Sequence, residues 1–200
     1  MNERELVTQA QSGDFEAFAT LVSAHKSKIY NLALKMTGNR PDAEDIVQDT
    51  MLKAIDNIEQ FRGEASFGTW LYSIALNQTR AHLANQKRTD LRPIEEYLPG
   101  ADLHAHSPHD RLSLFDWQDP HQLLEQDELR EIINRAIEVL PVKFREAFLL
   151  RYHEELPIKE VARLIGESVA ATKSRVLRAR LALRDHLSNV FKDRYGEKVQ

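Results

Sequence analysis

Hydrophobic residues recur at helical spacing through most of the chain. Leu6, Val7 and Ala10 form a short stripe, and a longer one from Phe18 to Met36 keeps a single face before Gly38. Alternation typical of strands is scarce, so the pattern predicts an all-α protein. A further regular stripe opens the C-terminal part and consists of Leu129, Ile132, Ile133, Ala136, Ile137 and Leu140.

Residues 41–58 predict a helix with two different faces. The inward positions are Ala43, Ile46, Val47, Thr50, Met51, Ala54, Ile55 and Ile58, and the opposite stripe contains Asp45, Gln48, Asp49 and Leu52. An acidic row interrupted by an exposed leucine describes either an ordinary solvated face or a docking surface for a basic partner. The spacing alone favours the solvated face.

The segment FRGEASFGTWLYSIALNQTRAHLANQKR, residues 61–88, predicts a loop followed by a helix from about Ser66. Its core stripe is Phe67, Trp70, Leu71, Ile74 and Ala75. The other side carries Thr69, Tyr72, Ser73, Asn77, Arg80 and Ala84, groups that can stack unpaired bases and hold phosphates. Because aromatic residues at this spacing more often form core, single-strand binding is the minority interpretation of the pattern.

Residues 89–128 have the composition of a flexible linker. They hold four of the seven prolines and lack sustained helical periodicity. His104, His106 and His109 form an HxHxxH cluster that could bind a transition metal. A polar loop flanked by prolines is a poor scaffold for such a site, so we expect no bound metal or cofactor.

Residues 157–184 predict a helix-turn-helix. A first helix starts at Pro157 and ends at Gly166, and Ser168 can cap the helix that follows. The second helix carries five basic residues and no acidic one between Ser168 and Arg184, while its packing side consists of Val169, Thr172, Val176, Ala179 and Leu183. A solvated helical hairpin is the alternative, but the one-sided charge favours a helix that enters the major groove of DNA.

Charge is unevenly distributed within the overall value of −4. Residues 1–88 carry −1, residues 89–128 carry −8 and residues 129–200 carry +5, which predicts two small helical domains joined by an acidic linker. The chain has no cysteine, its N-terminus does not resemble a signal peptide, and no apolar run approaches the roughly 20 residues of a membrane span. We therefore expect a cytoplasmic protein without direct membrane insertion.

The order of these motifs resembles the sigma-70 family of bacterial transcription initiation factors, and within it the small extracytoplasmic-function (ECF) group of stress-response regulators. DAEDIVQDTMLKAI is similar to the clamp-binding helix of region 2, residues 61–88 to its promoter-melting segment, and LPIKEVARLIGESVAATKSRVLRARLAL to region 4. The resemblance implies a non-enzymatic factor with region 2 in 1–88, a linker in 89–128 and region 4 in 129–200. Its implied partners are promoter DNA, the β′ clamp and β flap of core RNA polymerase, and an anti-sigma factor.

The resemblance also implies roles for individual residues. Asp45, Gln48, Asp49 and Leu52 would bind the β′ clamp, which reverses the preference for a solvated face. The minus-35 element would be read by Lys173, Ser174, Arg175, Leu177 and Arg178. The minus-10 element would be bound by Phe61, Arg62, Ser66, Phe67, Thr69, Asn77 and Arg80.

Departures from the family pattern prevent a promoter sequence from being carried over. Ala170 and Ala171 stand where relatives often have Gly and Thr, and Gly68 stands where an aromatic residue is frequent. Two other classes of function stay open at this point. One is a dimeric helix-turn-helix regulator, and the other is a hydrolytic metalloenzyme using the linker histidines with Asp102 or Asp110.

Overall fold

The computed structural model describes residues 2–89 and 126–195, and within these ranges its regular elements are all helical, as predicted. The N-terminal half contains α1 (Glu3–Gln11), α2 (Phe15–Thr37), α3 (Arg40–Asn57), the short 3-10 helix η1 (Ile58–Gln60) and α4 (Phe67–Thr89). The C-terminal half contains α5 (Gln126–Val139), α6 (Val142–Phe148), the π-helical turn η2 (Leu149–His153), α7 (Ile158–Ile165) and α8 (Val169–Tyr195).

Polar caps determine where the first helices begin. The Asn2 side chain accepts the backbone N–H of Glu5 in a capping box, and the Asp14 carboxylate accepts the N–H groups of Glu16 and Ala17. Gly38 ends α2 in the left-handed conformation, with φ of 71°, which a residue with a side chain rarely adopts.

The helix-turn-helix has the predicted form with small shifts at its ends. Pro157 lies at the N-cap position, directly before the first residue of α7, and Gly166 ends α7 with φ of 75°. The Ser168 hydroxyl accepts the N–H of Ala171 at 3.2 Å at the start of α8. Helix α8 continues to Tyr195, beyond the basic stretch that ends at Arg184.

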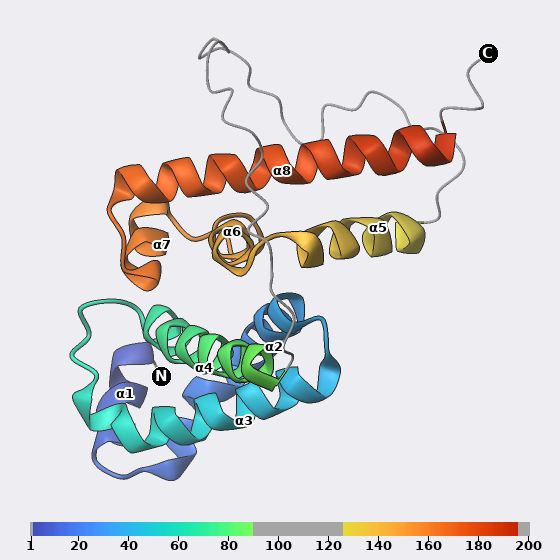
Figure 1. Cartoon of the computed structure of the whole chain (residues 1–200). Coiled ribbons are helices and arrows are strands. Elements are labelled where there is room, and N and C mark those ends of the chain that lie inside the picture. The colour runs from blue at the N-terminus through green and yellow to red at the C-terminus, as the bar shows by residue number, and fades with distance from the viewer. Residues whose placement is uncertain (1, 90–125, 196–200) are drawn as a thin grey trace.

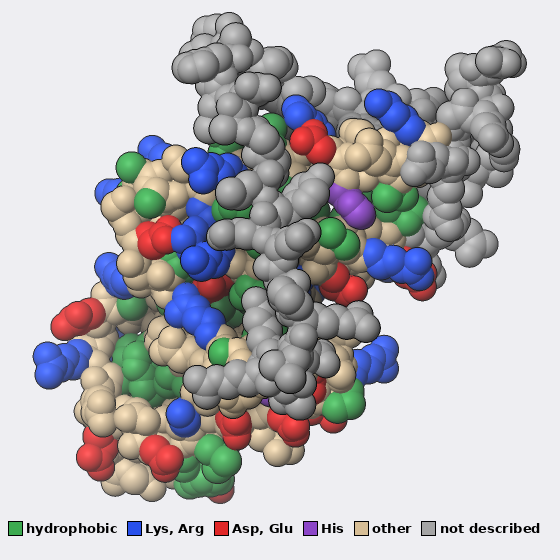
Figure 2. All heavy atoms as spheres, viewed as in Figure 1, with side chains coloured by type: hydrophobic (Ala, Val, Ile, Leu, Met, Phe, Trp, Pro, Cys, Tyr) green, Lys and Arg blue, Asp and Glu red, His purple; other side chains and the backbone are tan. Residues whose placement is uncertain are grey.

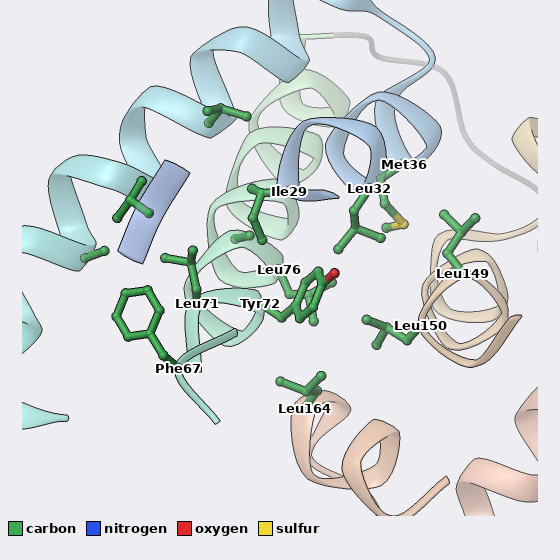
Figure 3. Close-up of a cluster of buried hydrophobic side chains, with 14 of the residues drawn as sticks. Ile29, Leu32, Met36, Phe67, Leu71, Tyr72, Leu76, Leu149, Leu150 and Leu164 are labelled. Atoms are coloured by element: carbon green, nitrogen blue, oxygen red, sulfur yellow. The ribbon is translucent and has the colours of Figure 1, made fainter. Parts of the chain in front are cut away.

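The two halves pack against each other, which the division into separate domains did not predict. Figure 1 shows α6 and α7 lying over α2 and α4, with α8 across the outside of the C-terminal half. In Figure 3, Leu149, Leu150 and Leu164 approach the buried side chains of Tyr72 and Leu76. These residues belong to one continuous apolar cluster, so burial between the halves adds to the stability of this arrangement.

None of the helices in the described ranges is both long enough and apolar enough to cross a bilayer.

Candidate nucleic-acid and polymerase interfaces

Helix α8 packs one side against the helix-turn-helix and leaves the other open. Thr172, Val176, Ala179 and Leu183 are buried as predicted, whereas Val169 is 37% exposed and not fully covered. Side-chain exposure on the opposite side matches the predicted minus-35 set, because Lys173, Ser174, Leu177 and Arg178 are exposed and Arg175 is half-buried. The geometry suits a helix lying in the major groove.

Arg175 differs from its neighbours because it already has a partner within the turn. Its guanidinium forms an ion pair with Glu167, and the Arg175 side chain is only 19% exposed. Glu167 comes directly after Gly166, so the pair ties α8 to the turn. Arg175 must leave this carboxylate before it can contact a base edge with its full set of donors.

Helix α3 presents the predicted acidic stripe to solvent. Asp45, Gln48, Asp49 and Leu52 are all exposed, Leu52 by 62%, while Ile46 and the other main inward positions are buried. Figure 2 shows acidic side chains along the N-terminal half and basic ones over the α7–α8 end. The carboxylates offer charge to a basic partner, and the exposed leucine among them offers apolar contact.

The loop before α4 is held at both ends by two side chains of α1. The Gln11 amide donates to the carbonyls of Ile58 and Phe61 at 3.1 and 2.8 Å, and Glu3 accepts the backbone N–H of Phe67 at 3.1 Å. The loop therefore has a defined shape, with Arg62 and Ser66 exposed on its surface.

Aromatic packing separates the predicted minus-10 residues into covered and open ones. Phe67 is fully buried, with ring centroids 5.8 Å from Phe61 and 5.5 Å from Trp70. Phe67 therefore packs inside the protein beside the loop, and in this conformation it is not accessible to DNA. Phe61 is half-buried, and Trp70, expected to pack inward, is only partly buried.

A shallow hollow lies between α3 and α4 beside Trp70. Asn77, one of the predicted minus-10 residues, is on its rim and is exposed. The sequence pattern did not single out Lys53 or Asn57 here, because they lie on a different helix from Asn77. The complete lining is Lys53, Asn57, Gln60, Trp70, Ile74, Asn77 and Gln78.

Gly68 lies so close to His25 that its lack of a side chain matters. A Cβ at this position would be 2.7 Å from the His25 Cε1 atom, well inside van der Waals contact. The imidazole packs beside Phe67 with ring centroids 5.8 Å apart, and burial lowers the pKa of His25 more strongly than nearby Glu3 raises it. His25 thus acts as a packed structural histidine and occupies the space that a larger residue at position 68 would need.

We expect Gly68→Ala to reduce the free energy of unfolding by about 1 kcal/mol, because overpacking against His25 outweighs the higher helix propensity of alanine. In a His25→Ala background the same substitution should be neutral or stabilising, since the obstructing ring is gone. Urea unfolding of the wild type, both single variants and the double variant measures this coupling. An equal effect of Gly68→Ala in both backgrounds would refute the steric explanation.

Part of the polar face of α4 is covered by the C-terminal half. Thr69 and Tyr72 are buried, and their hydroxyls contact Glu160 and Glu154, respectively. Burial and the Glu154 carboxylate raise the pKa of Tyr72, so its phenol stays protonated and donates. Arg80, a predicted minus-10 residue, forms an ion pair with Glu146, and its side chain remains 35% exposed.

The carboxylates that cover α4 were missed in the sequence. Their only signal is that Glu146, Glu154 and Glu160 are acidic residues in a basic half of the chain. No pattern in the sequence pairs them with residues about 66 to 91 positions away. The linker residues of the possible metal site lie outside the described part of the chain; they are His104, His106, His109, Asp102 and Asp110. In residues 2–89 and 126–195, no group of three or more potential metal ligands is found.

Comparison with known proteins decides the family. Residues 21–89 match the family described as Sigma-70 region 2, and residues 130–183 match Sigma-70, region 4. The ECF RNA polymerase sigma factor SigW of Bacillus subtilis is 33% identical over 187 residues, covering 94% of this chain and 97% of the relative. The chain belongs to the sigma-70 family, in its ECF group. Members of this family direct RNA polymerase to promoters and are not enzymes.

Other relatives of this sigma factor extend the match over nearly its whole length. The ECF RNA polymerase sigma-E factor of Escherichia coli K12 is 34% identical over 186 residues, covering 92% of this chain and 93% of the relative. The RNA polymerase sigma-H factor of Pseudomonas aeruginosa is 30% identical over 191 residues and 96% of both chains.

Two solved structures share the fold of the sigma factor. CnrH, in complex with the cytosolic domain of CnrY, is 24% identical, covers 94% of this chain and 97% of its own, and has a TM-score of 0.65. RpoE of Bartonella quintana, in complex with the anti-sigma factor NepR, is also 24% identical, covers 88% and 97%, and has a TM-score of 0.60.

Proposed function

We propose that this sigma factor divides promoter recognition and polymerase binding among three surfaces. Helix α8 reads the minus-35 element through Lys173, Ser174, Arg175, Leu177 and Arg178. The loop before α4 and the polar face of α4 bind and help to melt the minus-10 element. The exposed stripe on α3 binds the β′ clamp of core polymerase, and the C-terminal half contacts the β flap.

The observation that carries this proposal is that two stripes of opposite charge are exposed, each within a motif that resembles the sigma-70 family. The basic side of α8 and the acidic side of α3 are both open to solvent, although each helix has its other side in the core. Basic groups suit DNA phosphates and base edges, and acidic groups with Leu52 suit a basic protein surface. The site is therefore built for two different macromolecules at once.

Regulation by an anti-sigma factor is part of the proposal. CnrH and the Bartonella quintana RpoE have been solved with CnrY and the anti-sigma factor NepR, respectively, and both share the fold of this chain. An inhibitor of the same kind would cover the surfaces that bind polymerase. We place the action of the protein in the cytoplasm, where core polymerase and promoters meet.

We expect the isolated protein to bind promoter DNA weakly and to gain specific binding within the holoenzyme. Phosphate attraction dominates protein–DNA affinity, and the chain carries a net charge of −4. Docking both halves on DNA also costs entropy, which polymerase would reduce by holding them at promoter spacing.

A mobility-shift titration at physiological salt tests this with protein alone, core polymerase alone, and both together. The control DNA has scrambled minus-35 and minus-10 elements. Specific binding only in the combined sample is the expected result. Tight specific binding by the protein alone, unchanged by core, would indicate a conventional helix-turn-helix regulator instead.

A further inference from the structure

The C-terminal half places carboxylates directly on the polar groups of α4. Glu146 on α6 accepts hydrogen bonds from two nitrogens of Arg80, and Glu160 on α7 accepts the Thr69 hydroxyl at 2.7 Å. A third carboxylate, on Glu154, accepts the Tyr72 hydroxyl. Each contact joins a donor of the N-terminal half to an acceptor of the C-terminal half.

Glu146 is the most informative of these carboxylates because it is 4% exposed. Burial raises the pKa of Glu146, whereas the hydrogen bonds and charge of Arg80 act in the opposite direction. An ionised carboxylate is costly to bury without a partner, so Arg80 must satisfy it in this arrangement. Arg80 also approaches the carbonyl of Leu164 at 3.5 Å, so the guanidinium spans α6 and α7.

The donors involved are those that would bind a nucleic-acid backbone. Guanidinium and hydroxyl groups hold phosphate oxygens, and a carboxylate presents the same kind of anionic oxygen acceptors. Thr69 and Arg80 belong to the proposed minus-10 surface, and Tyr72 lies between them on α4. Each of these donors therefore bonds to a protein carboxylate, which takes the place that a phosphate oxygen of DNA would have.

Apolar contacts hold the same surfaces together. Leu149, Leu150 and Leu164 of the C-terminal half lie in one cluster with Leu76 and Met36 of the N-terminal half (Figure 3). At the edge of this contact, Lys35 donates to the Asn134 side chain at 3.2 Å, and Arg145 donates to the Met36 carbonyl. The covered state thus combines apolar burial with specific polar pairing.

We propose that the surface formed by Glu146, Glu154 and Glu160 is an internal partner of α4 that competes with minus-10 DNA for the same donors. This inference rests on the proposed minus-10 role of α4. DNA binding then requires the two halves to separate, and the apparent affinity falls by the fraction of molecules that are open. Core polymerase would release the inhibition by holding the halves apart.

The test compares full-length Glu146→Gln/Glu160→Gln with the wild type and with a charge-matched control. Glutamine keeps the shape of the side chain but removes the charge that holds Arg80. The control is Glu131→Gln/Asp185→Asn, which removes two exposed acidic charges that face Arg135 and Arg184 and contact no residue of α4. Urea unfolding shows first that all proteins are folded.

Two measurements are made without polymerase. Fluorescence anisotropy follows binding of a labelled single-stranded oligonucleotide of randomised sequence, because the competition is for donors that hold phosphate oxygens, and small-angle X-ray scattering gives the radius of gyration. The Glu146→Gln/Glu160→Gln variant should bind about tenfold more tightly than the control variant and have a larger radius of gyration. Both variants should initiate normally with saturating core polymerase.

Equal gains in the two variants would mean that net charge alone acts, and would overturn the proposal. So would an unchanged affinity, or tighter binding without expansion of the molecule. Failure of the proposed function is seen separately, since in that case no protein, including the wild type, would give promoter-specific binding with core polymerase.

Discussion

Replacing Arg178 by alanine should weaken recognition of the minus-35 element by about 1–3 kcal/mol, which is the discrimination expected from one bidentate base contact. Arg178 is exposed on the open side of α8, opposite the buried Ala179 and Val176. Arg175→Ala should also weaken recognition, but by less. The reason is that Arg175 forms an ion pair with Glu167, and breaking it offsets part of the energy that a new base contact provides.

The measurement is initiation by reconstituted holoenzyme from a promoter that depends on its minus-35 element, beside one with that element scrambled. Arg184→Ala is the matched control, because Arg184 lies on the same helix and is 55% exposed but faces Asp185. Loss of a phosphate contact alone would weaken both promoters equally. Wild-type initiation by both the Arg175 and Arg178 variants would refute the assignment of α8.

Reversing the charge of Asp45 or Asp49 should reduce the affinity for core polymerase by about tenfold or more while leaving the fold intact. Both side chains are exposed on α3, so no buried contact is lost, and a lysine would face the basic partner with like charge. The effect should shrink as salt is added, because exposed charges are screened. Leu52→Ala should lower affinity at all salt concentrations, since it removes apolar contact area.

Affinity is measured by titrating labelled core polymerase with each variant. Glu16→Lys is the control, because Glu16 is exposed on α2, a different helix from the one that carries the stripe. A loss of affinity in the Asp45 and Asp49 variants, but not in the control, distinguishes binding through the stripe from a general effect of charge. Unchanged affinity of the Asp45 and Asp49 variants would restore the interpretation of this surface as an ordinary solvated face.

Local features of the chain were predictable because they depend on neighbours in sequence. The spacing of Ile46, Val47 and Thr50 correctly predicted the buried side of α3, and Gly166 with Ser168 correctly predicted the turn before α8. Helical periodicity fixes which side chains share a face, and capping chemistry fixes where a helix starts or stops. The motifs in order were enough to indicate the family, which the comparisons then confirmed.

Tertiary structure decided which of these surfaces are free. The polar side of α4 is as clear in sequence as the acidic side of α3, yet Thr69 and Arg80 are paired with carboxylates from the other half of the chain whereas Asp45 is open. Pairing over such separations depends on how two apolar surfaces meet, and periodicity within one helix carries no information about that. The sequence by itself determined the helices, their faces and the family; only the packing of α6 and α7 on α4 decided that Thr69 and Arg80 are paired with carboxylates while Asn77 on the same helix stays exposed.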